Sequence, residues 1–338
     1  MPLRISYLGW YKGMIITVTT VIILVLGMLS IALSMYGGFV SSQIIDRYEE
    51  GPTSQAVERK YYLLGMIGTI VLLTRILIVP IYFWMLQSLV PYCPGAMCAS
   101  GVVNVSEPYS FISLILKILL PFVYGIWLLV EIANRRDPTL PFTRTLTMTF
   151  LVILLPLLVI DSAADVLLTA TIQPVFAPCC SSIYDVDPPF SPSAVLGPEV
   201  GIVILAATVL VSLSLSAFQW LESKYGPLRY LTLLLAIAAS ILYFITLHDT
   251  LAPLALGLPN HHCPFCLFQE FPDTALFAGL FWIGIASACW RVILELSWER
   301  RGLESRVNIN TISILRKISS VFLLFSIVSL ISHVLIAV

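Results

Sequence analysis

Eight long apolar stretches divide the sequence and decide what kind of fold it can adopt. Each is long enough to cross the hydrocarbon core of a bilayer, which takes about 20 mainly apolar residues in a helix. Backbone polar groups in lipid must pair within their own segment, so helices are the expected form. The sequence therefore predicts an all-α, polytopic transmembrane helix bundle that forms one integral membrane domain, residues 1–338. The predicted spans are 14–41, 61–90, 110–132, 147–172, 200–220, 229–250, 274–297 and 313–337.

The composition supports a membrane protein and argues against a nucleic-acid-binding one. Hydrophobic residues make up 59% of the 338 residues and charged residues only 11%. Soluble domains average about 45–50% and about 25%. A soluble globule of this size could not bury so much apolar surface, so the lipid bilayer is the expected partner of the chain. The net charge of −1 offers no basic surface for phosphates, which excludes nucleic acid as a partner.

Positive charges fall on one set of connections. They follow the first, third, fifth and seventh predicted spans, and the three loops between the other spans have none. These residues are Arg47, Arg59, Lys60, Arg135, Arg136, Arg144, Lys224, Arg229, Arg291, Arg300, Arg301, Arg306, Arg316 and Lys317. Since Lys and Arg concentrate on the cytoplasmic side, we expect these connections to be cytoplasmic and both termini to lie outside. Arg4 and Lys12 do not fit this orientation, because it places the N-terminus outside. An alternative topology has seven spans and a re-entrant first segment, and it leaves all the other loops on the same sides.

Each of the three extracytoplasmic loops carries one pair of cysteines. The pairs are Cys93 with Cys98, Cys179 with Cys180, and Cys263 with Cys266. Thiols on this side meet an oxidising compartment, so disulfide bonds are expected, although six cysteines allow 15 pairings. The pairs serve either as structural staples in Pro-, Gly- and Ser-rich loops or as redox-active groups. The remaining Cys289 lies within a span, where a cysteine usually packs as a small apolar residue.

The third loop has the most specific pattern, a C-x-x-C that follows two histidines. A C-x-x-C closes a small ring and often tunes a thiol pKa for exchange, and a neighbouring histidine can stabilise the thiolate. The same loop can instead bind copper or zinc through His261, His262, Cys263 and Cys266. Covalent haem attachment needs a histidine after the second cysteine, where this chain has Leu267. The residues leave a redox pair and a metal site as alternatives.

The run Cys263-Pro264-Phe265-Cys266-Leu267-Phe268-Gln269 resembles the motif of the DsbB-type quinone-linked disulfide-forming membrane proteins. Vitamin K epoxide reductase-like proteins have a similar C-x-x-C at a helix end. Glu270 stands where members often have arginine, and the other cysteine pairs lie upstream rather than downstream. The resemblance implies that electrons pass from a substrate dithiol to Cys93–Cys98 or Cys179–Cys180, then to Cys263–Cys266, then to a quinone. These six cysteines are the catalytic candidates.

Ionisable residues within the predicted spans are further candidates. Arg75, Lys117, Asp161 and Asp165 lie in three spans, and the two aspartates are four residues apart on one helix face. Charges in lipid are costly and usually face the bundle interior. They form either a proton path or a quinone or cofactor pocket contacted by Arg75, or a buried Arg75–aspartate ion pair that fixes helix packing.

Two histidines in the predicted spans are candidate haem ligands. His248 and His333 fall near the outer ends of two spans, at similar depth, where they can be the axial ligands of a b-type haem between helices. The sequence thus predicts a membrane thiol–disulfide or electron-transfer protein that acts on the extracytoplasmic face. One alternative is a non-catalytic subunit with structural disulfides that binds other membrane or extracytoplasmic subunits. The other is a haem- or soft-metal-binding membrane protein.

Overall fold

The described part of the chain is almost entirely helical in the computed structural model. It comprises residues 15–48, 55–136, 139, 141–172, 191–220, 226–300 and 309–337. Eight helices are long and apolar enough to span a membrane, and no strand occurs among these residues, so the predicted all-α transmembrane bundle is confirmed. The long helices are α1 (Val18–Tyr48), α2 (Gln55–Leu89), α4 (Tyr109–Arg135), α5 (Thr143–Thr149) continuing into α6 (Leu155–Thr171), α8 (Pro198–Trp220), α9 (Gly226–Thr246), α12 (Pro272–Glu299) and α13 (Ile309–Ala337).

Helix α1 departs most from its predicted bounds. The apolar run ends near Val40, but the helix continues to Tyr48. The extension follows from packing rather than hydropathy, because Ile44 is fully buried against Val57 and Tyr61 of α2. Packing against α2 therefore stabilises the last turns of α1, which follow the apolar run.

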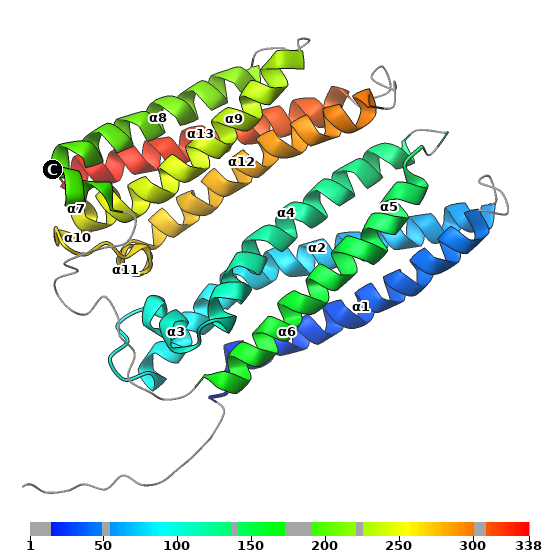
Figure 1. Cartoon of the computed structure of the whole chain (residues 1–338), viewed down its shortest axis with the longest axis horizontal. Helices are drawn as coiled ribbons and strands as arrows, with labels where there is room; N and C mark the ends of the chain where they lie inside the picture. Colours follow the sequence, from blue (N-terminus) through cyan, green and yellow to red (C-terminus); the bar gives the residue numbers. More distant parts are fainter. Residues whose placement is uncertain are drawn as a thin grey trace, which may run out of the picture.

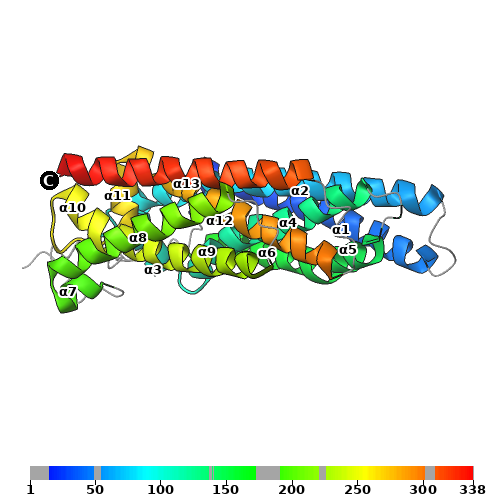
Figure 2. The same ribbon diagram turned by 90° about the horizontal axis from the view of Figure 1, so that it is seen from above.

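The long helices form two four-helix halves that lie side by side (Figure 1). Helices α1, α2, α4 and α6 make the N-terminal half, and α8, α9, α12 and α13 make the C-terminal half. In each half the first helix packs on the second, the second on the third, the third on the fourth, and the fourth on the first. All of them follow the long axis of the molecule (Figure 2). The two halves therefore share one packing order that residue-level comparison of the sequence does not reveal.

The connections alternate between two ends of the bundle. At one end, which we name the basic end, α1, α4, α8 and α12 end and α2, α5, α9 and α13 begin. The opposite end, the cysteine end, holds short helices that the sequence did not predict. They are α3 (Ala99–Val105), α7 (Pro192–Leu196), α10 (Ala252–Leu256) and α11 (Pro264–Glu270).

Two spans contain a π-helical turn just before a proline. These turns are η2 (Phe150–Leu154), ahead of Pro156, and η3 (Leu247–Leu251), ahead of Pro253. Proline donates no hydrogen bond, and its ring clashes with the carbonyl four residues earlier. In both spans that carbonyl lies inside the π turn, where the wider backbone makes room for the ring. The second turn also places two polar residues, His248 and Asp249, at the cysteine end.

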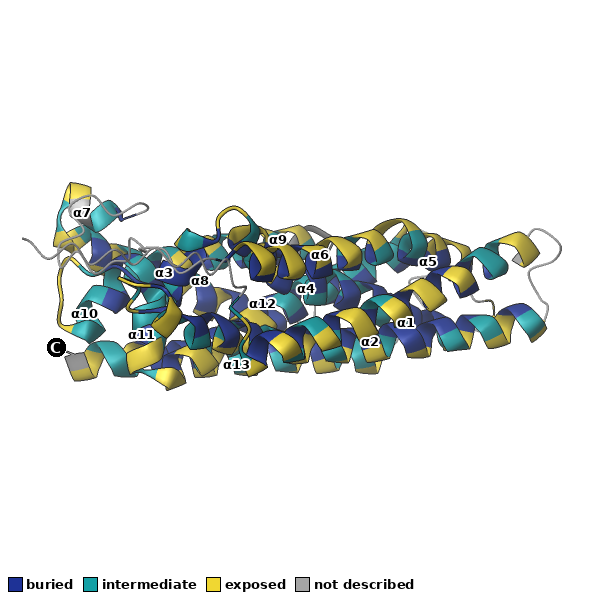
Figure 3. Ribbon diagram, turned by 90° about the horizontal axis from the view of Figure 1, so that it is seen from below, coloured by how far each residue is buried: buried dark blue, intermediate teal, exposed yellow. Residues whose placement is uncertain are grey.

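Exposed residues line the outward faces of the bundle (Figure 3), and many of them are large and apolar. Large exposed side chains include Met28, Leu73, Ile160, Leu234 and Val328. Soluble proteins rarely expose apolar surface on this scale, whereas lipid tails solvate it without cost. The chain is therefore an integral, multi-pass membrane protein with the bilayer as its surroundings.

Four buried charges connect three helices of the N-terminal half. Arg75 of α2 donates a hydrogen bond of 2.6 Å to Asp161 of α6. Lys117 of α4 donates to Asp161 at 2.6 Å and to both carboxylate oxygens of Asp165 at 2.8 Å. Ser113 adds a hydrogen bond of 2.6 Å to Asp165. Two cations thus balance two carboxylates, which confirms the predicted Arg75–aspartate ion pair and adds Lys117 to it.

Helices α4 and α12 join the two halves. Trp290 of α12 packs on Gly125 of α4, where any added side chain would overlap the indole ring. The Nε1 of Trp290 donates to the carbonyl oxygen of Phe122 at 3.0 Å. Nearer the basic end, the ring of Phe142, directly before α5, lies 4.4 Å from that of Trp298 between centroids. The third helix of one half therefore meets the third helix of the other through aromatic contacts.

The charge network makes a testable contribution to stability. We expect Lys117→Met to destabilise the protein by about 3–5 kcal/mol, because the buried carboxylate of Asp165 then loses its cation. Thermal unfolding in detergent, followed by tryptophan fluorescence, measures the loss. Adding Asp165→Asn to the same chain should restore much of the stability by removing the uncompensated charge. The control is Lys60→Met at the basic end, and equal melting temperatures of Lys117→Met and this control would contradict the network's role.

Candidate thiol site

A tight turn and a short helix position Cys98. The carbonyl of Cys93 accepts a hydrogen bond of 3.0 Å from the amide of Ala96. Between them lie Pro94 and then Gly95, which has a φ of 86°. This order fits a type II β-turn, in which proline sets the second position and glycine supplies the positive φ of the third. The turn leads the chain back to Cys98, whose extended backbone directly precedes α3.

A comparable arrangement positions Cys263 in the other half. Helix α10 ends at Gly257, whose φ of 66° is the left-handed conformation that terminates many helices. The chain then runs to Cys263, which directly precedes α11, and Pro264 is the first residue of that helix. Proline suits this position because its missing N–H has no partner there. Cys266 follows in the same first turn, so its sulfur lies on the same side as that of Cys263.

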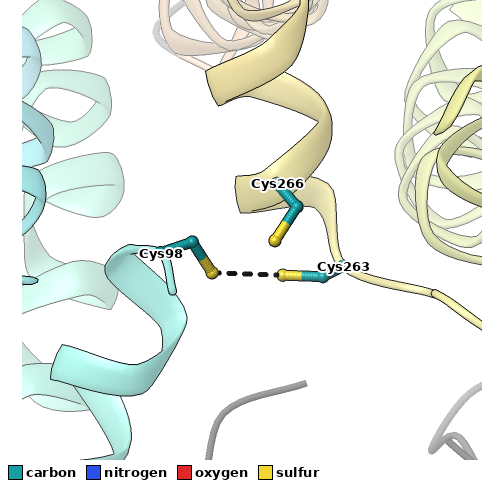
Figure 4. A group of neighbouring side chains, drawn as sticks. All are labelled: Cys98, Cys263 and Cys266. Carbon is teal, nitrogen blue, oxygen red and sulfur yellow. Dashed lines mark hydrogen bonds between the residues drawn. The ribbon is translucent and has the colours of Figure 1, made fainter. Parts of the chain in front are cut away.

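The two halves bring three sulfur atoms together (Figure 4). The Sγ atoms of Cys98 and Cys263 lie 3.7 Å apart in an S–H···S contact. Those of Cys98, Cys263 and Cys266 all lie within 4.8 Å of one another. Among the described cysteines, no disulfide bond joins Cys93 to Cys98, so a bridge within this pair is not formed. The thiol that Cys98 contacts belongs instead to the C-x-x-C of the other half.

Apolar side chains surround the three sulfurs. Cys98 is fully buried and Cys263 is 3% exposed, whereas Cys266 is partly exposed. Phe265 packs against the buried pair, and its ring lies 6.2 Å from that of Phe83 on α2. The site is therefore shielded from water on most sides, with Cys266 as its most accessible sulfur.

Cys93 lies in the neighbouring apolar cluster. It packs with Leu89, Ala99 and Val102, and burial raises the pKa of its thiol. A raised pKa keeps the thiol protonated at neutral pH, which makes it a slower nucleophile than an ordinary cysteine.

The histidines and cysteines of the third loop, predicted as ligands of one metal ion, lie in two separate groups. The Nδ1 of His262 lies 3.3 Å from the carbonyl oxygen of His248 and 3.3 Å from the Oγ of Ser191. Because a carbonyl oxygen only accepts, this Nδ1 carries the hydrogen. Ser191 in turn donates to the buried carboxylate of Asp249. The imidazole of His262 is thus held in a polar cluster beside η3, and within the described chain neither it nor His261 joins the sulfur group.

The histidines predicted as haem ligands have separate polar partners. The Nδ1 of His333 lies 2.9 Å from the carbonyl oxygen of Ser329, and its Nε2 lies 3.0 Å from a carboxylate oxygen of Asp273. Both ring nitrogens of His333 therefore already face oxygen atoms of the protein. The ring of His248 lies beside that of His262, with centroids 5.7 Å apart. The haem prediction gains no support from this arrangement.

The remaining predicted site residues lie away from the sulfurs or outside the described chain. Arg75, the candidate cofactor contact, belongs to the buried ion-pair network of the N-terminal half. Cys289 is partly buried in α12 and packs on the core of the C-terminal half. Cys179 and Cys180 lie outside the described residues. Among the described residues, the candidate site comprises the three sulfurs and Cys93 in the neighbouring cluster.

Sequence reasoning left open whether Cys93–Cys98 or Cys179–Cys180 lies beside Cys263–Cys266, and it did not single out the contact between Cys98 and Cys263. The positions of Cys98 and Cys263 in the order of helices could have indicated that they meet. Each precedes the short helix between the second and third helices of its half. Equivalent positions of two similar halves meet only where they lie close to the junction between the halves.

No protein family, curated protein or solved structure matches the chain. Its function must therefore be argued from the sulfur site. Three adjacent sulfurs support two kinds of chemistry, the exchange of disulfide bonds and the binding of a thiophilic metal ion.

The approach of the sulfurs should depend on the contact between α4 and α12. We expect Gly125→Leu to force Trp290 away and to slow oxidative cross-linking of Cys98 to Cys263. The slowing should be about 10–100-fold, since a displacement of about 1 Å can cost 10²-fold in rate. Mass spectrometry of linked peptides over time after adding a mild oxidant measures it. The control is Gly279→Leu on α12, where an added Cβ meets nothing within 4 Å, and equal rates in both variants would refute the dependence.

Proposed function

We propose that the chain is a membrane thiol–disulfide exchange protein that passes electrons from a substrate dithiol through its own cysteines to a quinone. The observation that carries this proposal is the 3.7 Å contact between Cys98 and Cys263 across the two halves. A thiolate beside a C-x-x-C is placed for the attack that begins disulfide exchange. The resemblance of the C-x-x-C segment to quinone-linked disulfide-forming proteins supports a quinone as the final acceptor.

The cysteine end is the extracytoplasmic one in this proposal. At the opposite end, the helices are joined by sequence segments with an excess of Lys and Arg, and such segments stay in the cytoplasm. Thiols at the cysteine end then meet an oxidising compartment, where disulfides form and persist. The substrate is a dithiol of a secreted or membrane-anchored protein, and the bilayer supplies the quinone.

The first exchange step links the two halves. It starts with a disulfide between Cys263 and Cys266 and a thiolate on Cys98. The Cys98 sulfur attacks the Sγ of Cys263, so that a Cys98–Cys263 bond forms and the Cys263–Cys266 bond breaks. Cys266 leaves as a thiolate and takes up the proton that Cys98 released. The observed sulfur separation is slightly longer than the roughly 3–3.5 Å of a near-attack geometry, so a small side-chain rotation suffices.

Cys93 completes the transfer. Its thiolate attacks the Sγ of Cys98, so that a Cys93–Cys98 bond forms, the link to Cys263 breaks, and Cys263 leaves as a thiolate that is then protonated. Two electrons have moved from the first pair to the second. A quinone then takes two electrons and two protons from Cys263 and Cys266 and becomes a quinol. The substrate dithiol reduces Cys93–Cys98 by the same exchange and leaves as a disulfide.

Removing the resolving thiol tests this scheme. We expect Cys93→Ser to accumulate the Cys98–Cys263 disulfide, because no second thiol is present to release it. The purified variant is reduced, treated with a quinone, blocked with a thiol reagent and digested, and mass spectrometry should find the linked peptide pair. The matched control Cys289→Ser should contain the Cys263–Cys266 bond instead. If the quinone left Cys98, Cys263 and Cys266 all reduced in both variants, the proposed function would be wrong.

The pH dependence of the second step offers an independent test. Because burial raises the pKa of Cys93, its reactive thiolate is scarce at neutral pH and increases about tenfold per pH unit below that pKa. In the wild-type chain, the Cys98–Cys263 intermediate should therefore decay faster as pH rises from about 7 to 9. Rapid mixing with acid quenching measures the decay. A decay rate that does not change with pH would contradict Cys93 as the resolving thiol.

A further inference from the structure

A second group of charged side chains lies inside the C-terminal half, at the basic end, and the thiol site does not use it. We propose that this group binds one phosphate-bearing anion, either an acidic lipid headgroup or free phosphate, through the guanidinium groups of Arg291 and Arg316 and the amide of Gln219. Neither the cysteines nor a quinone takes part, so the anion site is independent of the proposed exchange reaction.

All four long helices of the C-terminal half contribute to this group where they reach the basic end (Figure 1). On α12 its members are four residues apart, so they follow one face of the helix. The members are Gln219 of α8, Arg229 of α9, Arg291, Glu295 and Glu299 of α12, and Arg316 of α13.

The two carboxylates of the group are held mainly by Arg229. Its Nε lies 3.3 Å from the Oε2 of Glu295, and its Nη1 pairs with Glu299. Arg291 makes weaker contacts, because its Nη1 is 3.9 Å from Glu295 and its Nη2 donates to the hydroxyl of Thr232 at 3.2 Å. The Nε of Arg291 is buried and has no hydrogen-bond partner within the described chain. This guanidinium therefore keeps a donor for a further ligand.

Positive charge exceeds negative charge in this group. Among the described residues it contains three guanidinium groups and two carboxylates, and the side chain of Glu299 is 40% exposed to solvent. Arg229 and Arg316 are close enough to Arg291 to repel its charge. Arginine does not lose its proton in proteins, and an uncompensated buried charge is costly. An anion bound here would balance the excess, which the N-terminal half lacks because two cations meet two carboxylates there.

The amide of Gln219 is a second sign that a polar ligand binds here. The residue is 1% exposed, and within the described chain neither its Nε2 nor its Oε1 has a hydrogen-bond partner. Buried polar groups are almost always paired in native proteins. The backbone carbonyl of Gln219 accepts a hydrogen bond from the Nε of Arg316, so the amide and this guanidinium belong to the same contact between α8 and α13.

The donors suit phosphate. A guanidinium group presents parallel N–H groups that match two phosphate oxygens, and a neutral amide adds a further donor. Basic sites between transmembrane helices on the cytoplasmic side bind acidic lipid headgroups. Arg316 is partly exposed at this end and gives access, whereas Arg291 is 1% exposed. Arginines that only fix the orientation of a chain remain in water, so the burial of Arg291 indicates a further role.

Binding to the full-length protein tests the anion site. The protein is purified in detergent, stripped of lipid, and mixed with dioctanoyl phosphatidate, dioctanoyl phosphatidylcholine or inorganic phosphate. Native mass spectrometry should count one bound phosphatidate and no phosphatidylcholine, whose choline neutralises the phosphate. Phosphatidate should also raise the melting temperature, because a ligand that binds only the folded chain stabilises it. Displacement of phosphatidate by inorganic phosphate would assign the site to free phosphate, and retention of the lipid would assign it to a headgroup.

Charge substitutions identify the ligands. Arg316→Gln should weaken phosphatidate binding about 10-fold or more, the usual effect of losing a hydrogen bond to a charged group. The matched control is Lys317→Gln, which removes the same charge from the next, exposed residue of α13 and should keep the affinity. Glu299→Gln should strengthen binding by up to about 5-fold, because it removes one negative charge of a partly exposed pair. A gain in affinity cannot arise from misfolding.

A neutral substitution separates a ligand from a packing residue. Gln219→Leu removes the buried amide at similar volume, so the melting temperature of the lipid-free protein should not fall. Phosphatidate binding should nevertheless weaken about 3-fold or more, as expected for the loss of one hydrogen bond.

Three results would overturn the anion site. They are the absence of phosphatidate and phosphate binding by the folded wild-type chain, equal affinities of Arg316→Gln and Lys317→Gln, and an unchanged affinity of Gln219→Leu. None of them bears on disulfide exchange, which is decided by trapping the bond between Cys98 and Cys263 at the other end of the bundle.

Discussion

The hydrocarbon interior of the bilayer constrains every other feature of this chain. It offers no hydrogen bonds, so the backbone must satisfy itself within each span, and helices are the form that results. The same constraint accounts for the π turn before Pro156, which accommodates the carbonyl that this proline cannot pair with. It also explains why Arg75 and Lys117 are bonded to aspartates between α2, α4 and α6 rather than exposed to lipid.

The contact between the halves forms the sulfur site, because each half contributes cysteines to it. Each half is a closed ring of four helices, and α4 meets α12 where Gly125 leaves room for Trp290. That approach brings α3 and α11 together at the cysteine end, so that one thiol from the N-terminal half meets two from the C-terminal half. A sulfur site at a junction responds to the packing of both halves, and a bond formed there ties them to each other.

The sulfur atoms combine close spacing with burial, and the two properties have different consequences. Close spacing favours exchange, because the reacting atoms need to move little. Burial opposes it, because an apolar environment keeps a thiol such as Cys93 protonated. Cys266 is partly exposed, so it is the sulfur of this group that a molecule outside the site can reach most easily.

The sequence by itself determined the number and kind of spans, because length and apolarity are local properties that lipid acts on directly. It also indicated that Arg75 would pair with an aspartate, since a buried charge requires a counter-ion. Only the tertiary structure decided which thiols meet. Cys98 and Cys263 are 165 residues apart, and they meet across two halves that pack together where the indole ring of Trp290 contacts Gly125. Packing of this kind depends on the shapes of two surfaces together, which neither segment of sequence specifies alone.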